Sequence, residues 1–148
     1  MAILERYLSK TLSPVQVKDE NDIQYKNNDK RALNGPFQLF KINTELKQGK
    51  KRDVDLLADD DVVQVILHKM APGTHNDLHC HRAQDEVWIV YEGQMTFYGE
   101  DHQEVARLNP GEGLFLPRGV PYWFASTGDE AAVLLRVGAT HPGIPNER

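Results

Sequence analysis

The sequence has little of several features that mark particular classes of protein. It contains one cysteine, Cys80, among 148 residues, which excludes an intramolecular disulfide framework and is compatible with a reducing cytoplasm. Only 17 Lys and Arg stand against 22 Asp and Glu, for a net charge of -5, so there is no basic footprint for nucleic acid or for an anionic membrane. The apolar stretch at 1–12 is interrupted by Glu5 and Arg6, which argues against a signal peptide or a membrane span. We expect a soluble, cytosolic protein.

The length predicts one domain, because 148 residues can bury a real core but are too few for two independent ones. We divide the chain into an N-terminal helix and polar connection (1–36), a folded body (37–138) and a tail (139–148). The helix is short and amphipathic, and we expect it to dock on its own domain or on a second subunit. Its apolar residues recur at helical spacing and are Ile3, Leu4, Tyr7, Leu8 and Leu12.

Short apolar, β-branched segments follow one another through the body and are separated by turn signals such as Pro72-Gly73. Many short strands with regular turns favour an all-β antiparallel sandwich or barrel. The charged segment 45–61 combines a basic cluster with an acidic one, and we interpret it as a solvated surface loop. The strands are predicted at 37–43, 62–70, 86–91, 94–98, 114–116, 122–125 and 132–137.

Two histidines and a glutamate form a candidate metal site. On a strand, alternate residues face the same way, so His79 and His81 project side by side. A bend at 82–85 would return Glu86 to them on the neighbouring strand, with Asp85 pointing away. Two imidazoles and one carboxylate suit a divalent transition metal with open coordination sites, so we expect iron, zinc, manganese or nickel.

Strand parity also predicts which residues line the interior. Trp88, Tyr122 and Phe124 should face inward and suggest a pocket for an apolar or aromatic ligand, unless these rings simply fill the barrel. Gln64 and His68 should face the same cavity. His68 is either a hydrogen-bonded core histidine or a base in the pocket.

Two motifs resemble those of the cupin superfamily, in the expected order. The first, G-x5-H-x-H-x4-E-x6-G, is matched at every fixed position by Gly73, His79, His81, Glu86 and Gly93. The second, G-x5-P-x-G-x2-H-x3-N, is matched by Gly111, Pro117 and Gly119. This second motif departs from the family at two positions, because Tyr122 stands where the fourth ligand is usual and Ser126 replaces the asparagine.

The resemblance implies a double-sheet jelly roll, also called a double-stranded β-helix, that forms a homodimer and holds a divalent metal inside. Three ligands, His79, His81 and Glu86, still suffice for a site with exchangeable positions. A phenol ligates a metal well only when deprotonated. Tyr122 therefore either becomes such a ligand or offers a hydrogen bond or a proton to a bound molecule.

The leading hypothesis is a metal-dependent enzyme acting on a small organic substrate, aromatic or polyketide-like, with Tyr122 or His68 moving protons. The three ligands do not separate a dioxygenase from a non-redox cyclase, isomerase or lyase. The alternative is a module that binds a small molecule without turnover. A metal-free sugar epimerase or isomerase is a weaker third possibility.

Overall fold

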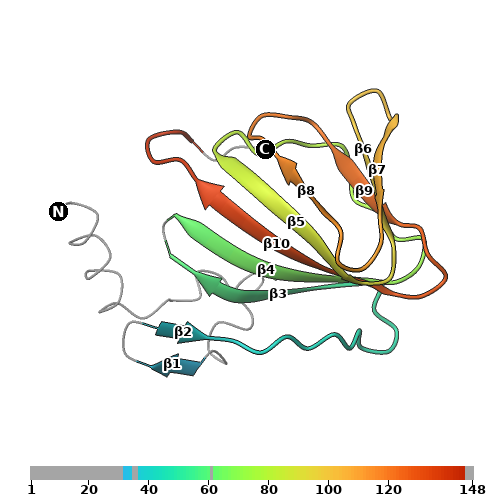
Figure 1. The fold of residues 1–148 in the computed structure, drawn as a ribbon, viewed down its shortest axis with the longest axis horizontal. Coiled ribbons are helices and arrows are strands. Elements are labelled where there is room, and N and C mark those ends of the chain that lie inside the picture. Colours follow the sequence, from blue (N-terminus) through green and yellow to red (C-terminus); the bar gives the residue numbers. More distant parts are fainter. Residues whose placement is uncertain (1–31, 35–36, 61, 146–148) are drawn as a thin grey trace.

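The computed structural model describes residues 32–34, 37–60 and 62–145, and within them the chain forms strands and no helix (Figure 1). The predicted N-terminal helix lies outside the described residues. No helix among the described residues is long and apolar enough to cross a membrane. The strands are β1 (Ala32–Asn34), β2 (Phe37–Leu39), β3 (Arg52–Asp59), β4 (Val63–Met70), β5 (Gln84–Glu92), β6 (Met95–Tyr98), β7 (Glu104–Leu108), β8 (Gly113–Leu116), β9 (Trp123–Ser126) and β10 (Ala132–Thr140).

The body consists of two antiparallel sheets that face each other. The larger sheet has the order β3-β4-β10-β5-β8 and the smaller one the order β7-β6-β9, while β1 and β2 pair separately. Strands far apart in the sequence are neighbours in space, as β10 is with both β4 and β5. This arrangement confirms the predicted all-β jelly roll.

The core lies between the two sheets and follows from side-chain alternation along the strands. In β5, Glu86, Trp88 and Val90 are buried, whereas Val87 and Ile89 on the other face are exposed. The main core cluster combines residues of both sheets, namely Met70, Trp88, Val90, Met95, Phe97, Leu108, Leu116, Tyr122, Phe124, Ala132 and Leu134.

The structure corrects the interpretation of segment 45–61 as a surface loop, because most of its second half forms β3. Val54 and Leu56 are buried there. The acidic residues that alternate with them face a buried lysine on β4, with Asp55 lying 3.2 Å and Asp53 3.8 Å from Lys69 Nζ. The run of charges therefore includes a strand that buries apolar side chains and whose carboxylates are balanced by a lysine across the sheet.

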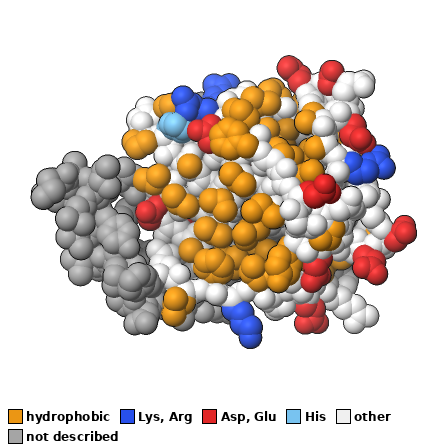
Figure 2. Space-filling model, viewed as in Figure 1, with side chains coloured by type: hydrophobic (Ala, Val, Ile, Leu, Met, Phe, Trp, Pro, Cys, Tyr) orange, Lys and Arg blue, Asp and Glu red, His pale blue; other side chains and the backbone are white. Residues whose placement is uncertain are grey.

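The outer face of the larger sheet carries exposed apolar side chains, among them Val87, Ile89, Tyr91 and Phe115. Figure 2 shows hydrophobic side chains gathered at the centre of the visible face. Large exposed apolar surfaces often mark contacts between proteins. The expected homodimer nevertheless stays a prediction, which light scattering on the purified chain would measure.

Candidate functional site

The two histidines of the first motif lie on a short extended segment between β4 and β5. This segment is not a regular strand as predicted; His79 instead forms an isolated bridge with Tyr122, through backbone bonds of 3.1 and 2.8 Å. The carbonyl of His81 accepts a bond of 2.9 Å from the amide of Gly119. Gly119 has φ +78°, which favours glycine. The second motif thus holds both histidines in place, with their ring centroids 5.1 Å apart.

Glu86 reaches the same place from β5. Bends at 82–83 precede the strand, so that Glu86 is buried in the interior while Asp85 bonds outward to Arg118, as the parity predicted. One carboxylate oxygen, Oε1, lies 3.5 Å from Nε2 of His81. The structure therefore brings His81 and Glu86 into contact, with His79 beside them.

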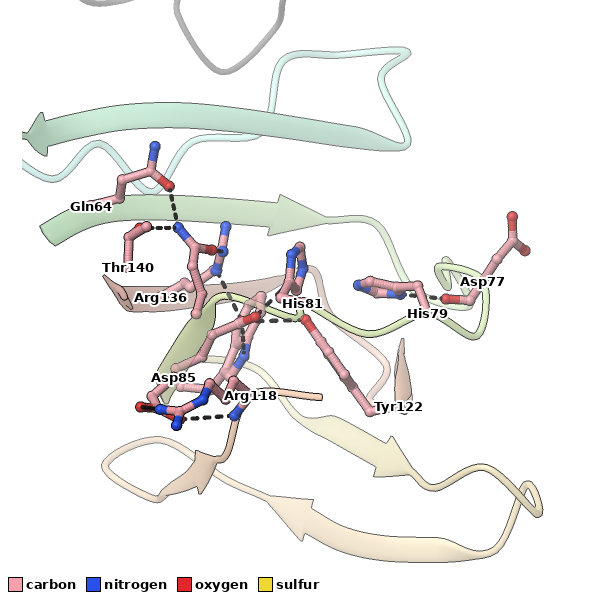
Figure 3. A network of polar contacts seen from close by, with 12 residues as sticks. Gln64, Asp77, His79, His81, Asp85, Arg118, Tyr122, Arg136 and Thr140 are labelled. Atoms are coloured by element: carbon pink, nitrogen blue, oxygen red, sulfur yellow. Dashed lines mark hydrogen bonds and ion pairs between the residues drawn. The ribbon is translucent and has the colours of Figure 1, made fainter. Parts of the chain in front are cut away.

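The other oxygen of Glu86, Oε2, accepts three hydrogen bonds. The donors are Trp88 Nε1 at 2.9 Å, Arg136 Nε at 2.9 Å and Tyr122 Oη at 3.3 Å. Figure 3 shows this network, with Tyr122 approaching from the segment just before β9 and Arg136 from β10. In contrast, Oε1 is buried and accepts no hydrogen bond from the described residues.

Electrostatics at Glu86 are a balance of opposing effects. Burial raises the pKa of this carboxyl above its usual value of 4.5, and it is the largest cause. The charge of Arg136 and the bonds from Trp88 and Tyr122 act in the other direction, because they favour the ionised form.

Arg136 is the charged residue at this site that sequence reasoning missed. It is 4% exposed and lies on the inward face of β10, in register with Trp88 of β5. The signal was present, since Ala132, Leu134 and Arg136 alternate along a predicted strand and share one face. A charged residue on an otherwise apolar inward face is a candidate for a buried ion pair.

The donor chemistry of the site fits a divalent metal. His79 Nδ1 lies 2.6 Å from the carbonyl of Asp77, an arrangement that places the proton on Nδ1 and the lone pair on Nε2, as in ligating histidines. Two ligand atoms that share one ion stand about 3.0–3.5 Å apart, which the Oε1–Nε2 distance of 3.5 Å matches. Among the described residues, no group of three or more His, Cys, Asp or Glu side chains is already arranged to hold a metal ion, so the fit lies in the donor types and in the approach of His81 to Glu86.

His68 lies inside the barrel on β4, as predicted, with its ring 5.1 Å from that of Trp88 and 6.2 Å from that of Phe124. It is buried, and neither ring nitrogen has a hydrogen-bond partner among the described residues. Burial, followed by the charges of Arg52 and Arg136, holds the pKa of His68 well below 6.5. The imidazole is therefore neutral at neutral pH, with one donor and one acceptor.

The predicted pocket residues divide into two environments. Trp88 and Phe124 are buried and pack against each other and against Phe97, as expected of rings that fill a barrel. Gln64 belongs to a polar network, because its Oε1 accepts a bond of 3.2 Å from Gln84. Their predicted role in lining a substrate pocket stays a prediction.

A second polar cluster lies outside the barrel at the start of β5. Asp85 accepts a bond of 2.8 Å from the amide of Arg118 and lies 2.6 Å from Nε2 of His141. These two bonds, above all the one from the Arg118 amide, lower the pKa of Asp85. The cluster ties the turn of the second motif and the C-terminal segment to β5.

Comparison with known proteins identifies the fold family. The Cupin_2 family model, described as a cupin domain, matches residues 66–138. No curated protein matches the chain significantly.

Three solved structures illustrate the likeness. A protein from Thermus thermophilus is 27% identical, with 67% of this chain and 92% of that chain covered and a TM-score of 0.58. A protein named as a sugar phosphate isomerase, from Silicibacter pomeroyi, is 28% identical over 62% and 61% of the two chains, with a TM-score of 0.55. A predicted oxalate decarboxylase from Thermotoga maritima is 18% identical over 60% and 80%, with a TM-score of 0.55, a likeness of fold alone. The family-model match and the shared fold together identify residues 66–138 as a cupin domain.

Proposed function

We propose that this cupin is a metal-dependent enzyme that acts on a small organic molecule inside its barrel. His79, His81 and Glu86 would hold a divalent transition metal. Iron, zinc, manganese and nickel all accept imidazole and carboxylate ligands.

One observation carries the proposal. Oε1 of Glu86 is a buried carboxylate oxygen that accepts no hydrogen bond from the described residues, and it lies 3.5 Å from His81 Nε2. A buried charged atom without a hydrogen bond is costly, and coordination of a metal by both atoms would relieve that cost. The tautomer that Asp77 imposes on His79 supports the same use.

The side chains around Glu86 define what the protein itself contributes. A bound divalent metal supplies Lewis acidity toward a substrate oxygen and open coordination positions. Tyr122 Oη donates to Glu86 across 3.3 Å, a long bond that the phenol could exchange for one to a bound substrate. Tyr122 is then positioned to hold or deliver a proton at that substrate. His68, which is neutral and faces the same interior, is the second candidate for a proton acceptor.

The reaction class stays open between a dioxygenation and a non-redox isomerisation, cyclisation or elimination. The likeness to a sugar phosphate isomerase at 28% identity keeps a non-redox reaction among the candidates. An aromatic or polyketide-like substrate remains the prediction from Trp88 and Phe124, although both rings are engaged in the core.

A second candidate, a binding module without metal or turnover, is favoured by a different observation. The guanidinium of Arg136 already balances the charge of Glu86 at 2.9 Å, and this positive charge opposes a dication nearby. The weaker metal-free epimerase or isomerase shares this expectation of a metal-free site.

Elemental analysis of the full chain, purified without chelators and again after reconstitution, separates these functions. We expect about one equivalent of a transition metal in the wild type and little in His79→Ala and Glu86→Ala. His75→Ala is the matched control, because His75 lies exposed in the same segment with its Nδ1 3.1 Å from the carbonyl of Asn76.

The outcomes are distinct. A wild type without stoichiometric metal, even after reconstitution, would rule out the metal-dependent enzyme and favour the binding module. Metal that persists in Glu86→Ala would show that the ion binds elsewhere. If iron is present, oxygen consumption with candidate phenols distinguishes a dioxygenase from a non-redox enzyme.

A further inference from the structure

A chain of buried polar groups leads from the wall of the barrel to Glu86. Arg136 donates from Nε to Glu86 Oε2 at 2.9 Å and from Nη2 to Oε1 of Gln84. The amide nitrogen of Gln84 donates in turn to Gln64 Oε1 at 3.2 Å and to Thr140 Oγ1 at 3.0 Å. In Figure 3, Gln64 and Thr140 lie on the side of Arg136 that is away from Tyr122. The guanidinium is therefore held at two points.

This double attachment fixes the orientation of the guanidinium. A guanidinium is planar, and its donors have a rigid geometry, so anchoring Nη2 on Gln84 determines where Nε points. Gln84 is itself buried and sits two residues before Glu86 on the inward face of β5. The anchor and the carboxylate thus share one rigid strand.

The consequence for Glu86 is that its two oxygens become different. Three donors meet Oε2, which satisfies its lone pairs, while Oε1 accepts no hydrogen bond from the described residues and faces His81. Rotation of the carboxylate plane away from this orientation would break the three bonds to Oε2. One oxygen is held by the protein and the other is presented to the histidine.

We propose that Arg136, anchored by Gln84, is a positioning residue that orients Glu86 so that Oε1 is presented together with His81 to the metal. The inference rests on the proposed metal site. Partners that hydrogen-bond to metal ligands commonly change metal affinity by about 10- to 100-fold when they are removed.

Binding of Co²⁺ to the full-length, metal-depleted chain tests the inference, with affinity and the visible absorption of the bound ion as readouts. We expect Arg136→Met to bind Co²⁺ about 10- to 100-fold more weakly than the wild type, with an altered spectrum. Arg136→Lys keeps the charge and a single donor nitrogen but not the rigid pair of bonds, so we expect partial rescue of affinity. Arg118→Met is the matched control and should bind as the wild type does, because Arg118 pairs with Asp85 outside the barrel.

Each outcome decides the question. If the wild type binds Co²⁺ and Arg136→Met, folded by circular dichroism, binds it with the same affinity and spectrum, the inference is wrong while the metal site stands. If the wild type does not bind Co²⁺, the proposed function fails and the inference fails with it.

Gln84→Met keeps the inference testable if Arg136→Met does not fold. This variant removes the anchor and leaves the bond between Arg136 and Glu86 available. We expect a few-fold loss of Co²⁺ affinity and a changed spectrum. Wild-type values for both would overturn the role of the anchor, and with it the proposal.

Discussion

Two neighbouring carboxylates of β5, Asp85 and Glu86, each pair with an arginine, but on opposite faces of the strand. Inside the barrel, the side chains of Glu86 and Arg136 are 1% and 5% exposed and lie 2.9 Å apart. Outside, those of Asp85 and Arg118 are 25% and 44% exposed and lie 3.6 Å apart. The same two functional groups therefore meet in two different environments, one residue apart.

The difference in environment reverses the effect on the acid. Burial dominates at Glu86 and raises its pKa, whereas hydrogen bonds from Arg118 and His141 dominate at Asp85 and lower its pKa. Water screens the charges of the outer pair, Asp85 and Arg118, and this pair joins segments of chain. In the inner pair, by contrast, loss of either Glu86 or Arg136 would leave the other as an uncompensated buried charge.

Removal of the inner arginine, Arg136, should have the largest effect on stability. We expect Arg136→Met to lower the free energy of unfolding of the metal-free protein by about 3–5 kcal/mol, because Glu86 loses its buried counter-charge. Arg118→Met should cause a much smaller loss. Urea unfolding at neutral pH measures both, and equal losses in the two variants would contradict the contrast between the faces.

The double variant Glu86→Leu with Arg136→Met sharpens the result. Replacement of a buried ion pair by apolar residues is often neutral or stabilising, so we expect the double variant to regain most of the stability that Arg136→Met loses. A double variant as unstable as the sum of the single variants would mean that the two residues do not act as a pair.

The pH dependence of stability should have opposite signs at the two carboxylates, with effects smaller than that of Arg136→Met. The lowered pKa of Asp85 stabilises the fold above the usual value of 3.8, and this contribution is lost as the pH falls through the folded pKa. The raised pKa of Glu86 has the reverse effect, so stability is lost as the pH rises from 4.5 through the folded pKa.

Isosteric amides test these signs in metal-free protein. Compared with the wild type, Asp85→Asn should lose less stability on acidification below pH 3.8, and Glu86→Gln should lose less as the pH rises above 4.5. Urea unfolding over this range supplies the measurement. The same slope in Glu86→Gln as in the wild type would show that burial does not govern this carboxyl.

Tyr122→Phe should have the smallest effect on stability. The variant removes one of three donors to Oε2, so we expect a loss of about 0.5–1.5 kcal/mol in the free energy of unfolding. Metal content should stay unchanged, because Arg136 and Trp88 still hold the carboxylate. Unchanged activity with unchanged metal content would rule out a proton role for Tyr122.

The sequence predicted the fold because its signals are local. Alternation and turn residues marked β4, β5, β6 and β10 to within a few residues. The same reasoning failed at β3, where a run of charges suggested a loop. Asp55 is compatible with a strand because it pairs with Lys69 on β4. A local sequence pattern does not reveal such a contact between strands.

At the candidate site, too, the sequence predicted one part of the arrangement and missed another. Parity on β5 placed Glu86 inside and Asp85 outside, as the structure has them. Parity alone could not reveal that Arg136, 50 residues later, donates to Glu86. That contact depends on the register in which β10 meets β5.

The sequence by itself determined the jelly roll and singled out His79, His81 and Glu86 as candidate ligands, since spacing and alternation fix which side chains share a face. Only the tertiary structure decided how the charge of Glu86 is balanced and which of its oxygens faces His81. The physical reason is that a buried carboxylate is defined by the donors around it, and here those donors come from three separate parts of the chain.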